Sequence, residues 1–331
     1  MPATTDLNQT DRIVGIATKS IPCFPLDELN SKSSGVSSRM ISDIREACLE
    51  TGFFYVDPGQ DSSFVNRTLN VAREFFDIDD SDPRKTAIAR GDDDFGWMPT
   101  FSEPAYQPGT VAHMESFDCG IENVRDLRTD DVWPDIPGFR ADVTRCWSEF
   151  SAIGETVLQK LSLAFGLDAD FLLSACSTQE LSTLRLLHYP ENQAGDCSHN
   201  VGISAHTDFE CITLIYQTAP GLELRDVSGH WYDAPAHDSR IVVLLGDMLE
   251  RWTNGSLQAT GHRVRNTHFQ RHSIVMFFAV NDDIEVKPLP DFVPRDSRPG
   301  YSPTRQREHI DTEVRRAMRN KTSDSTQPAS P

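Results

Sequence analysis

Apolar residues recur at two different spacings along the chain, and the spacing changes just past the middle. In the first half they recur every three or four residues, as at Val65, Leu69 and Phe76, which predicts a helix with one buried face. Residues 139 to 165 repeat this spacing over a longer stretch, and the following Gly166 is a residue type that commonly ends a helix. We therefore expect the first half of the chain to be mostly helical.

From about residue 182 the pattern changes to short runs that are apolar throughout or that alternate between apolar and polar residues. Turn-forming pairs such as Pro220-Gly221 separate the runs, and GDML (246–249) is expected to form a further turn between strands. The six predicted strands lie in STLRLLHYP, GISAHTDFECITLIYQ, LELRD, RIVVLLGDMLERWT, ATGHRVR and RHSIVMFFAV. Strands that follow one another without helices between them predict an antiparallel sandwich or jelly roll.

Together the two halves predict an α+β fold, with a double-stranded β-helix (jelly-roll) core and a helical N-terminal region packed around it. Both ends of the chain are polar and rich in small residues, which is typical of disorder. We expect one catalytic domain rather than two independent ones. Its expected parts are a disordered N-terminus (1–12), a mostly helical N-terminal region (13–179), the jelly-roll core (180–284), a C-terminal extension and helix (285–318) and a disordered tail (319–331).

The net charge narrows the choice of partners. The chain has 31 Lys and Arg residues against 50 Asp and Glu residues, which gives a formal net charge of −19. An acidic surface repels the phosphates of nucleic acids and anionic lipids, so we expect neither nucleic acid nor a membrane as a partner. The 7 cysteines include no CxxC pair and no apolar leader precedes them, which favours a cytoplasmic protein. We expect a monomer or a weak dimer.

His206 and Asp208 stand two positions apart within the apolar, β-branched run ISAHTDFECITLIYQ. Alternate residues of a strand share one face, so the imidazole and the carboxylate are expected to converge in the interior of a sheet. Three interpretations of this pair are open: a polar pair that stabilises the core, a proton-transfer pair, or two ligands of a metal.

A second group of polar residues lies on the last two predicted strands. If these strands pair as a hairpin, then His262 shares one face with Arg271 and Ser273, while His272 points to the other face. Two imidazoles and one carboxylate on one face form the facial triad that holds iron(II) and leaves coordination positions open. The guanidinium of the arginine would offer two parallel N–H groups, and the serine a hydroxyl, to a carboxylate lying deeper in the barrel.

The joint pattern of these motifs resembles a known enzyme family. The segments LLHYP, AHTDFECITLIYQ, GLELRD, VLLGDMLERWTNGSLQATGHRV and RHSIVMFF are similar to the core of the iron(II)/2-oxoglutarate dioxygenases of the isopenicillin N synthase type. Upstream, IPCFPLDEL, ACLETGFFYV, AREFFDI, AHMESFDCGIE and WPDIPGFR resemble the N-terminal region of that family. The resemblance extends from about residue 20 to residue 290.

The resemblance implies roles for individual residues. It implies that His206, Asp208 and His262 bind Fe(2+) and form the catalytic centre. It also implies that Arg271 and Ser273 bind the distal carboxylate of the co-substrate 2-oxoglutarate.

Tyr189, in HYP, stands where many relatives place a tyrosine that helps to hold the co-substrate or the substrate. Many plant members carry an asparagine two residues before that tyrosine, whereas this chain has Leu187. The departure puts the co-substrate contacts at this position in doubt. A half-buried strand tyrosine is the alternative interpretation of Tyr189.

The implied enzyme is an oxidoreductase, a non-haem iron(II)/2-oxoglutarate-dependent dioxygenase with 2-oxoglutarate and O2 as co-substrates. It would oxidise an unactivated C–H bond of a small organic metabolite by hydroxylation, desaturation or ring rearrangement, and release succinate and CO2. An oxidase of the isopenicillin N synthase or aminocyclopropane carboxylate oxidase type is an alternative, because those enzymes keep the Arg-x-Ser pair without using 2-oxoglutarate. A non-catalytic metal-binding or sensing protein on the same barrel is a more remote alternative.

The region that receives the substrate is expected to include residues 95–120, Phe278 and the helix near the C-terminus. A small molecule is the expected substrate, since the sequence shows no accessory domain for a macromolecule. His188 and His272 are expected to be surface or packing residues, and Cys211 a small buried hydrophobic residue.

Overall fold

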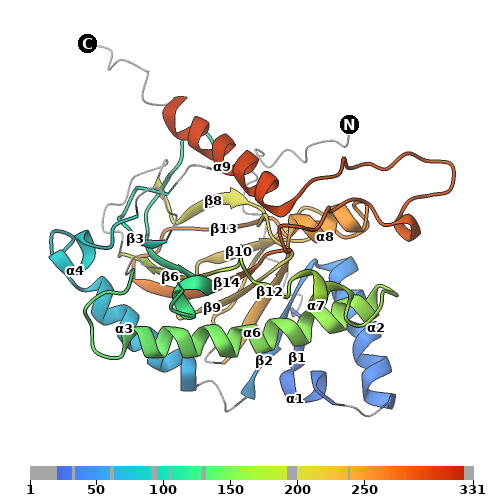
Figure 1. Cartoon of the computed structure of the whole chain (residues 1–331), viewed down its shortest axis with the longest axis horizontal. Helices are drawn as coiled ribbons and strands as arrows, with labels where there is room; N and C mark the ends of the chain where they lie inside the picture. Colours follow the sequence, from blue (N-terminus) through green and yellow to red (C-terminus); the bar gives the residue numbers. More distant parts are fainter. Residues whose placement is uncertain are drawn as a thin grey trace.

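The computed structural model describes residues 21–31, 34–59, 63–90, 95–103, 106–127, 132–191, 200–237 and 239–323 (Figure 1). The predicted disordered N-terminus at 1–12 lies outside these residues, and so does the end of the chain from 324. Helix α9 (Gln306–Ser323) continues beyond the predicted end at 318, since neither glycine nor proline occurs within it. None of the helices in the described part of the chain combines the length and the apolar character that a membrane-spanning segment needs.

A large sheet of eight strands forms the centre of the molecule. Every neighbouring pair of strands for which a register is given runs antiparallel except β1 and β2. In spatial order the strands are β1 (Cys23–Pro25), β2 (Phe53–Asp57), β12 (Ile241–Leu245), β9 (Ile212–Gln217), β14 (Arg271–Phe278), β6 (Thr183–Tyr189), β5 (Glu115–Gly120) and β3 (Gly96–Met98).

A smaller sheet faces the large one across a shared apolar cluster. Ile215 and Val275 of the large sheet belong to the same cluster of buried residues as Leu224 and Val264 of the small sheet, so the space between the sheets is an apolar interior. The small sheet consists, in order, of β11 (Trp231–Asp233), β10 (Leu222–Arg225), β13 (His262–Val264) and β8 (Ile203–His206). A separate parallel pair joins β4 (Val111–Ala112) to β7 (Asn200–Val201).

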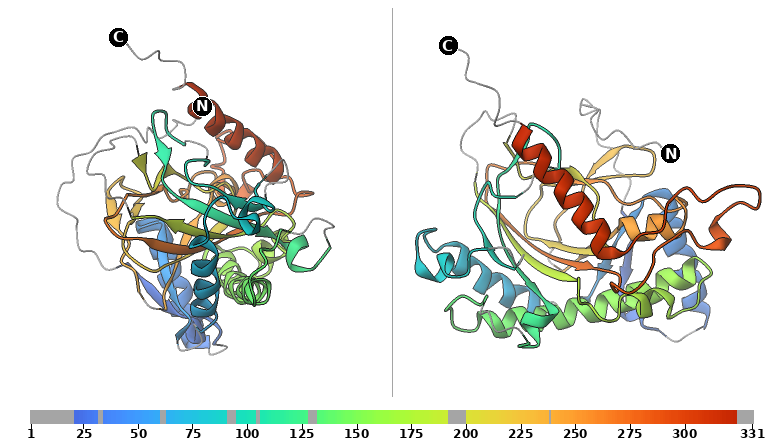
Figure 2. Two further views of the ribbon diagram at one scale, coloured as in Figure 1. Left: turned by 90° about the vertical axis from the view of Figure 1, so that its left-hand side faces the viewer. Right: turned by 45° about the horizontal axis from the view of Figure 1, so that its top comes forward.

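Helices cover the outside of the sheets, and Figures 1 and 2 show α6 and α9 on opposite sides of the strands. The prediction of a long helix at 139–165 is confirmed by α6 (Phe139–Ala164), and Gly166 follows it with a φ of +74°. The other helices are α1 (Leu26–Leu29), α2 (Ser34–Glu50), α3 (Ser63–Phe76), α4 (Pro83–Thr86), α5 (Ile121–Val124), α7 (Phe171–Ala175), α8 (Asp247–Trp252) and the 3₁₀ turn η2 (Pro290–Phe292).

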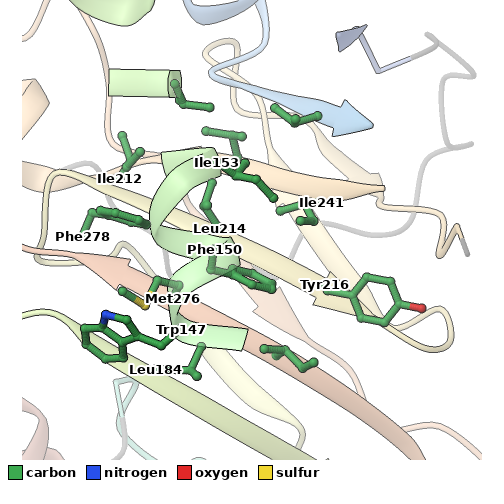
Figure 3. Packing of buried hydrophobic residues seen from close by; sticks show 14 of the residues in the cluster. Trp147, Phe150, Ile153, Leu184, Ile212, Leu214, Tyr216, Ile241, Met276 and Phe278 are labelled. Atoms are coloured by element: carbon green, nitrogen blue, oxygen red, sulfur yellow. The ribbon is translucent and has the colours of Figure 1, made fainter. Parts of the chain in front are cut away.

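Helix α6 packs against the outer face of the large sheet. Figure 3 shows Trp147, Phe150 and Ile153 of the helix against residues of β9 and β14, including Met276 and Phe278. The contact is close at Gly154, where a Cβ atom would lie 2.0 Å from the ring of Phe278. Phe278 therefore faces the helix and not the interior between the sheets, and its expected place beside the substrate is wrong.

The first half of the chain contributes more than helices. Strands β1, β2, β3 and β5 all come from the region predicted to be mostly helical, and they extend the large sheet at both edges. The apolar run Phe53–Asp57 forms β2, because aromatic and β-branched residues pack well on a sheet whose two faces are covered. Helices from this half do pack around the sheets, as expected.

Two of the predicted strands are divided in the structure. GISAHTDFECITLIYQ forms β8 and β9, which belong to different sheets and are joined by residues 207–211. In RIVVLLGDMLERWT the strand β12 ends at Leu245 and helix α8 begins at Asp247. GDML is thus the start of a helix and not a turn between strands.

The assumed hairpin of the last two strands is also wrong. Strand β13 pairs with β8 and β10 of the small sheet, whereas β14 pairs with β6 and β9 of the large sheet. His262 consequently faces Arg271 and Ser273 from the opposite sheet and does not lie beside them on one sheet.

Candidate active site

Three side chains that can bind a metal meet at the end of the small sheet. His206 is the last residue of β8 and lies directly opposite His262, the first residue of β13. Asp208 follows the end of β8, and its Oδ1 lies 3.7 Å from Nε2 of His206 and 3.6 Å from Nε2 of His262. One ligand atom from each residue lies within 4.8 Å of the others. The three predicted residues therefore converge, although Asp208 lies beyond the strand that the sequence assigned to it.

Neighbouring groups fix the direction in which these side chains point. Nδ1 of His206 lies 2.8 Å from the carbonyl oxygen of Ser204, and Nδ1 of His262 lies 3.1 Å from that of Thr260. A carbonyl oxygen only accepts, so each Nδ1 carries the proton and each Nε2 keeps a lone pair facing the centre. The hydroxyl of Thr213 donates to Oδ2 of Asp208 at 2.5 Å, which leaves Oδ1 to face the two imidazoles.

Helix α8 holds the loop that carries Asp208. The backbone N–H of Asp247 donates to the carbonyl of Asp208 at 2.9 Å, and that of Met248 donates to the carbonyl of Glu210 at 3.1 Å. Gly246 permits this approach, since a Cβ atom there would lie 2.2 Å from the carbonyl oxygen of Glu210. The GDML segment thus has a role in the site that the sequence did not indicate.

The electrostatics of the group suit a divalent cation. Burial, with the neighbouring imidazole of His262, lowers the pKa of His206 to about 3. Neutral imidazoles are the form that binds metal. Two neutral nitrogen ligands and one carboxylate on one side of an ion, with other positions open, make up the ligand set of non-haem iron(II) sites, so these residues fit that metal.

A buried arginine lies on the facing sheet. Arg271 of β14 is 1% exposed, and one of its terminal nitrogens donates to Oε1 of Gln217 and to Oγ of Ser273, both at 2.9 Å. Its guanidinium carbon lies 4.4 Å from the ring centroid of Tyr189. Its Nε and its other terminal nitrogen have no hydrogen-bond partner among the described residues.

Such an arrangement calls for an anion. Burial lowers the pKa of Arg271, because the charged form is poorly solvated there. Buried cations in proteins are normally paired, and an arginine that directs free N–H groups into an interior suits a carboxylate bound in a fork. Gln217 completes this site; it lies 54 residues from Arg271 along the chain, so no local sequence pattern links the two.

The expected arrangement of side chains along β14 is confirmed. Arg271 pairs in register with Tyr189, and Ser273 pairs with Leu187 and Gln217, so these side chains share the face toward the interior. The ring of His272 lies on the other face and stacks on His188, with centroids 4.8 Å apart. His188 and His272 are buried packing residues, and Cys211 is buried and free, as expected.

An aromatic residue that no sequence motif marks also belongs to the site. The ring of Tyr106 stacks on His206, with centroids 4.3 Å apart and an interplanar angle of 10°. Its hydroxyl donates to Oε1 of Glu103 at 2.9 Å. Both residues come from the 95–120 region, which was expected near the substrate.

Two family models match this chain. The model of the 2OG-Fe(II) oxygenase superfamily matches residues 181–280, which include all the strands that carry the predicted metal and anion ligands. A model described as the N-terminal region of a non-haem dioxygenase in morphine synthesis matches residues 21–136.

Individual relatives agree with this assignment. A 2-oxoglutarate-Fe(II) type oxidoreductase of Aspergillus fumigatus is 28% identical over 284 residues, which are 79% of this chain and 82% of that protein. The 2-oxoglutarate-dependent dioxygenase citB of Monascus ruber is 29% identical over 299 residues, 83% of this chain and 90% of that protein.

Solved structures share the fold. A full-length Neurospora crassa protein in complex with alpha-KG and thymine superposes with a TM-score of 0.79 at 22% identity, over 92% of this chain and 100% of that chain. A dioxygenase for auxin oxidation from rice superposes with a TM-score of 0.70 at 22% identity, over 89% of this chain and 95% of that chain.

The two family models cover both the N-terminal region and the strands of the site. His206, Asp208 and His262 lie close enough together to hold a metal ion, and they are the two histidines and one carboxylate of a non-haem iron(II) ligand set. This chain belongs to the 2OG-Fe(II) oxygenase superfamily.

Proposed function

We propose that this protein is a non-haem iron(II)/2-oxoglutarate-dependent dioxygenase that oxidises an unactivated C–H bond of a small organic metabolite and releases succinate and CO2. The observation that carries this proposal is the buried Arg271, whose Nε and one terminal nitrogen lack partners among the described residues, on the sheet that faces the two histidines and Asp208. A dicarboxylate such as 2-oxoglutarate has one end for the metal and one for the arginine.

In this proposal His206, Asp208 and His262 hold Fe(2+), while Arg271 and Ser273 hold the distal carboxylate of 2-oxoglutarate. The Arg271 fork gives the co-substrate one orientation, because two parallel N–H groups match the geometry of a carboxylate. When bound, the iron, 2-oxoglutarate and O2 supply the oxidising chemistry.

The remaining residues of the site orient these groups and exclude water. Thr213 fixes the carboxylate of Asp208, and the carbonyls of Ser204 and Thr260 fix the imidazoles. Tyr189 covers one face of the Arg271 guanidinium, so its proposed part is to shield the ion pair from water. The apolar residues between the sheets keep the interior dry, which strengthens every charge interaction in it.

The names of the relatives favour the dioxygenase over the oxidase alternative. Several carry 2-oxoglutarate in their names, and one from Glycine max is named a homoarginine-6-hydroxylase. The non-catalytic alternative is disfavoured because all three proposed iron ligands are present and oriented. Small molecules such as thymine are bound in structural neighbours, in keeping with a small-molecule substrate here.

The finer assignments are also part of the proposal. Residues 180–284 form a double-stranded β-helix, 13–179 the N-terminal region around it, and 285–318 the C-terminal extension. The protein is proposed to act in the cytoplasm as a monomer or weak dimer, without nucleic-acid or membrane partners, in keeping with its net charge of −19.

Anaerobic titration of the iron-loaded protein with 2-oxoglutarate tests this function. Chelation of the metal by the co-substrate is expected to produce a visible charge-transfer band that saturates at one equivalent per site. Succinate release in air should then depend on a metabolite found by screening, with products identified by mass spectrometry. Turnover of a substrate without the band and without 2-oxoglutarate would instead establish the oxidase alternative.

A further inference from the structure

Four charged side chains form a largely buried cluster beside the proposed iron site. This carboxylate–arginine cluster consists of Arg90, Glu103, Asp118 and Arg185. Arg185 of β6 lies directly opposite Asp118 of β5. The carboxylate oxygens of Asp118 accept three bonds of 2.8–3.0 Å from Arg185 and lie 2.8 Å from a terminal nitrogen of Arg90. Another terminal nitrogen of Arg185 donates to Oε1 of Glu103 at 3.2 Å.

The cluster faces the interior between the sheets. Arg185 pairs in register with Val275, which lies two residues from Ser273 on the same face of β14. Its guanidinium carbon lies 5.7 Å from the ring centroid of Phe277, on that face as well. The cluster therefore lies on the same face of the large sheet as Ser273 and Arg271, and this face looks into the interior.

Tyr106 connects the cluster to the metal site. Its hydroxyl donates to Oε1 of Glu103, and its ring lies flat on His206. Glu103 is consequently one tyrosine side chain away from a proposed iron ligand. A molecule that contacts Glu103 from the interior would lie within reach of the oxidising centre.

Within the cluster, one carboxylate oxygen of Glu103 accepts no hydrogen bond from the described residues. Glu103 is 4% exposed, and its Oε1 accepts from both Tyr106 and Arg185. Its Oε2 is buried and has no hydrogen-bond partner among the described residues. Ser116 is fully buried, faces Met98 and Leu187 in register, and its hydroxyl likewise has no partner among those residues.

Unpaired buried polar atoms are uncommon and destabilising. Two of them near one side of the proposed site call for a ligand, since the bonds that Arg185 makes go to Asp118 and to Oε1 of Glu103 and leave Oε2 without a donor. A carboxylate oxygen accepts hydrogen bonds only, so the group that pairs with Oε2 of Glu103 must be a donor.

We propose that Glu103 determines substrate specificity by accepting a hydrogen bond at Oε2 from a neutral N–H or O–H group of the primary substrate. This inference rests on the proposed function and adds the substrate class: a small neutral molecule with a polar donor on a mainly apolar body. Ser116 provides a second, weaker polar contact at the same end.

Charge balance argues for a neutral substrate. Two arginines and two carboxylates already neutralise one another in the cluster, so a charged group placed there has no counterion left and carries a desolvation cost. A carboxylate on the substrate would in addition face Oε2 of Glu103. The neighbouring Met98 and Met114 are buried and Phe277 packs with them, which suits an apolar body.

Pairs of probe molecules test this inference on the unaltered protein. The probes are phenol with anisole, uracil with its dimethyl derivative, and benzamide with its dimethyl derivative; benzoate and benzylamine serve as charged comparators. Each is titrated anaerobically into protein loaded with iron and 2-oxoglutarate, and binding is followed by the perturbation of the charge-transfer band and by calorimetry. The unmethylated member of at least one pair should bind tenfold or more tightly than its methylated partner, and tighter than either charged probe.

The isosteric variant Glu103→Gln sharpens the test. Its amide oxygen can keep the bonds from Tyr106 and Arg185, which places the NH2 group at the position of Oε2 and replaces an acceptor with a donor. Affinity for the unmethylated probes should fall by about tenfold to a hundredfold, the range for a hydrogen bond to a charged group. Glu122→Gln, at an exposed position on α5, is the matched control and should change nothing.

The outcomes separate this inference from the proposed function. If the wild-type protein forms no band with 2-oxoglutarate, the proposed function fails. If the band forms but no unmethylated probe binds, or both members of every pair bind equally, the inference about Glu103 is overturned. Tighter binding of benzoate or benzylamine, or unchanged selectivity in folded Glu103→Gln protein, would also overturn it.

Discussion

The ring of Tyr106 lies flat on the imidazole of His206, with centroids 4.3 Å apart. The two residues lie a hundred positions apart in the sequence, and the stack supports the orientation of a proposed iron ligand. An aromatic pair of this kind contributes about 0.5–1.5 kcal/mol beyond the area it buries.

Replacing Tyr106 with alanine should therefore weaken iron binding by about twofold to tenfold, because the imidazole loses a contact that holds its orientation. Anaerobic titration with iron(II), followed by calorimetry, measures the change. The control is Tyr106→Phe, which keeps the ring and loses only the hydroxyl bond to Glu103. Equal losses in both variants would show that the hydroxyl, and not the stack, supports the metal site.

The three proposed ligands make a second prediction. His206→Ala or Asp208→Ala removes one of three protein ligands, so each folded variant should lose iron binding and turnover. His272→Phe is the matched control on the opposite face of β14, where the ring stacks on His188, and it should retain both the metal and the charge-transfer band. Parent-level turnover by either ligand variant would refute the assignment of these residues to iron.

Much of the site was predictable because strands constrain their side chains locally. The alternation of faces along a strand places Arg271 and Ser273 together and turns His272 away, whatever the strand pairs with. His206, Asp208 and the later His262 are residue types that bind metals, and the structure brings them together.

The pairing of strands was not predictable from local pattern. Residues 265–270 separate β13 from β14, and a connection of about six residues spans up to about 20 Å, twice the spacing of about 10 Å between packed sheets. Such a loop permits either a hairpin within one sheet or a connection between two sheets, and here it connects the small sheet to the large one. Gln217, Tyr106 and Glu103 were missed for a related reason, since only the tertiary fold brings them to the site.

The pH dependence of stability provides a third prediction. Burial lowers the pKa of His272 to about 3, with a further contribution from His188. In the unfolded chain this histidine takes up a proton near its ordinary pKa of about 6.5, so between these pH values the unfolded state binds more protons. The free energy of unfolding should therefore decrease as the pH falls from about 6.5, by at most about 1.4 kcal/mol per pH unit from this residue.

Chemical denaturation at a series of pH values measures this slope. His272→Phe keeps an aromatic ring at the site but cannot titrate, so its unfolded state takes up roughly one proton less than that of the parent protein. The unfolding free energy of the variant should therefore fall less steeply between pH 6 and pH 4. The comparison uses slopes, because the substitution also changes packing. Identical slopes in the two proteins would show that His272 is protonated in the folded state.

The last prediction concerns what Arg271 binds. Breaking a buried pair of arginine and carboxylate from one side costs about 2–5 kcal/mol, because the other charge stays buried without a partner. Arg271→Ala should therefore weaken 2-oxoglutarate binding by roughly 30-fold to several-thousand-fold. Ser273→Ala removes one neutral donor and should cost only about 1–3 kcal/mol.

Arg271→Lys keeps the positive charge but loses the pair of parallel N–H groups. It also loses the bonds that one terminal nitrogen makes to Gln217 and Ser273. The affinity of this variant for 2-oxoglutarate should therefore lie between those of the parent protein and Arg271→Ala. Anaerobic titration of the charge-transfer band measures all three, and the separately measured affinity for the primary substrate should change little. Loss of substrate affinity with an unchanged affinity for 2-oxoglutarate would make Arg271 a clamp for the substrate and would support the oxidase alternative.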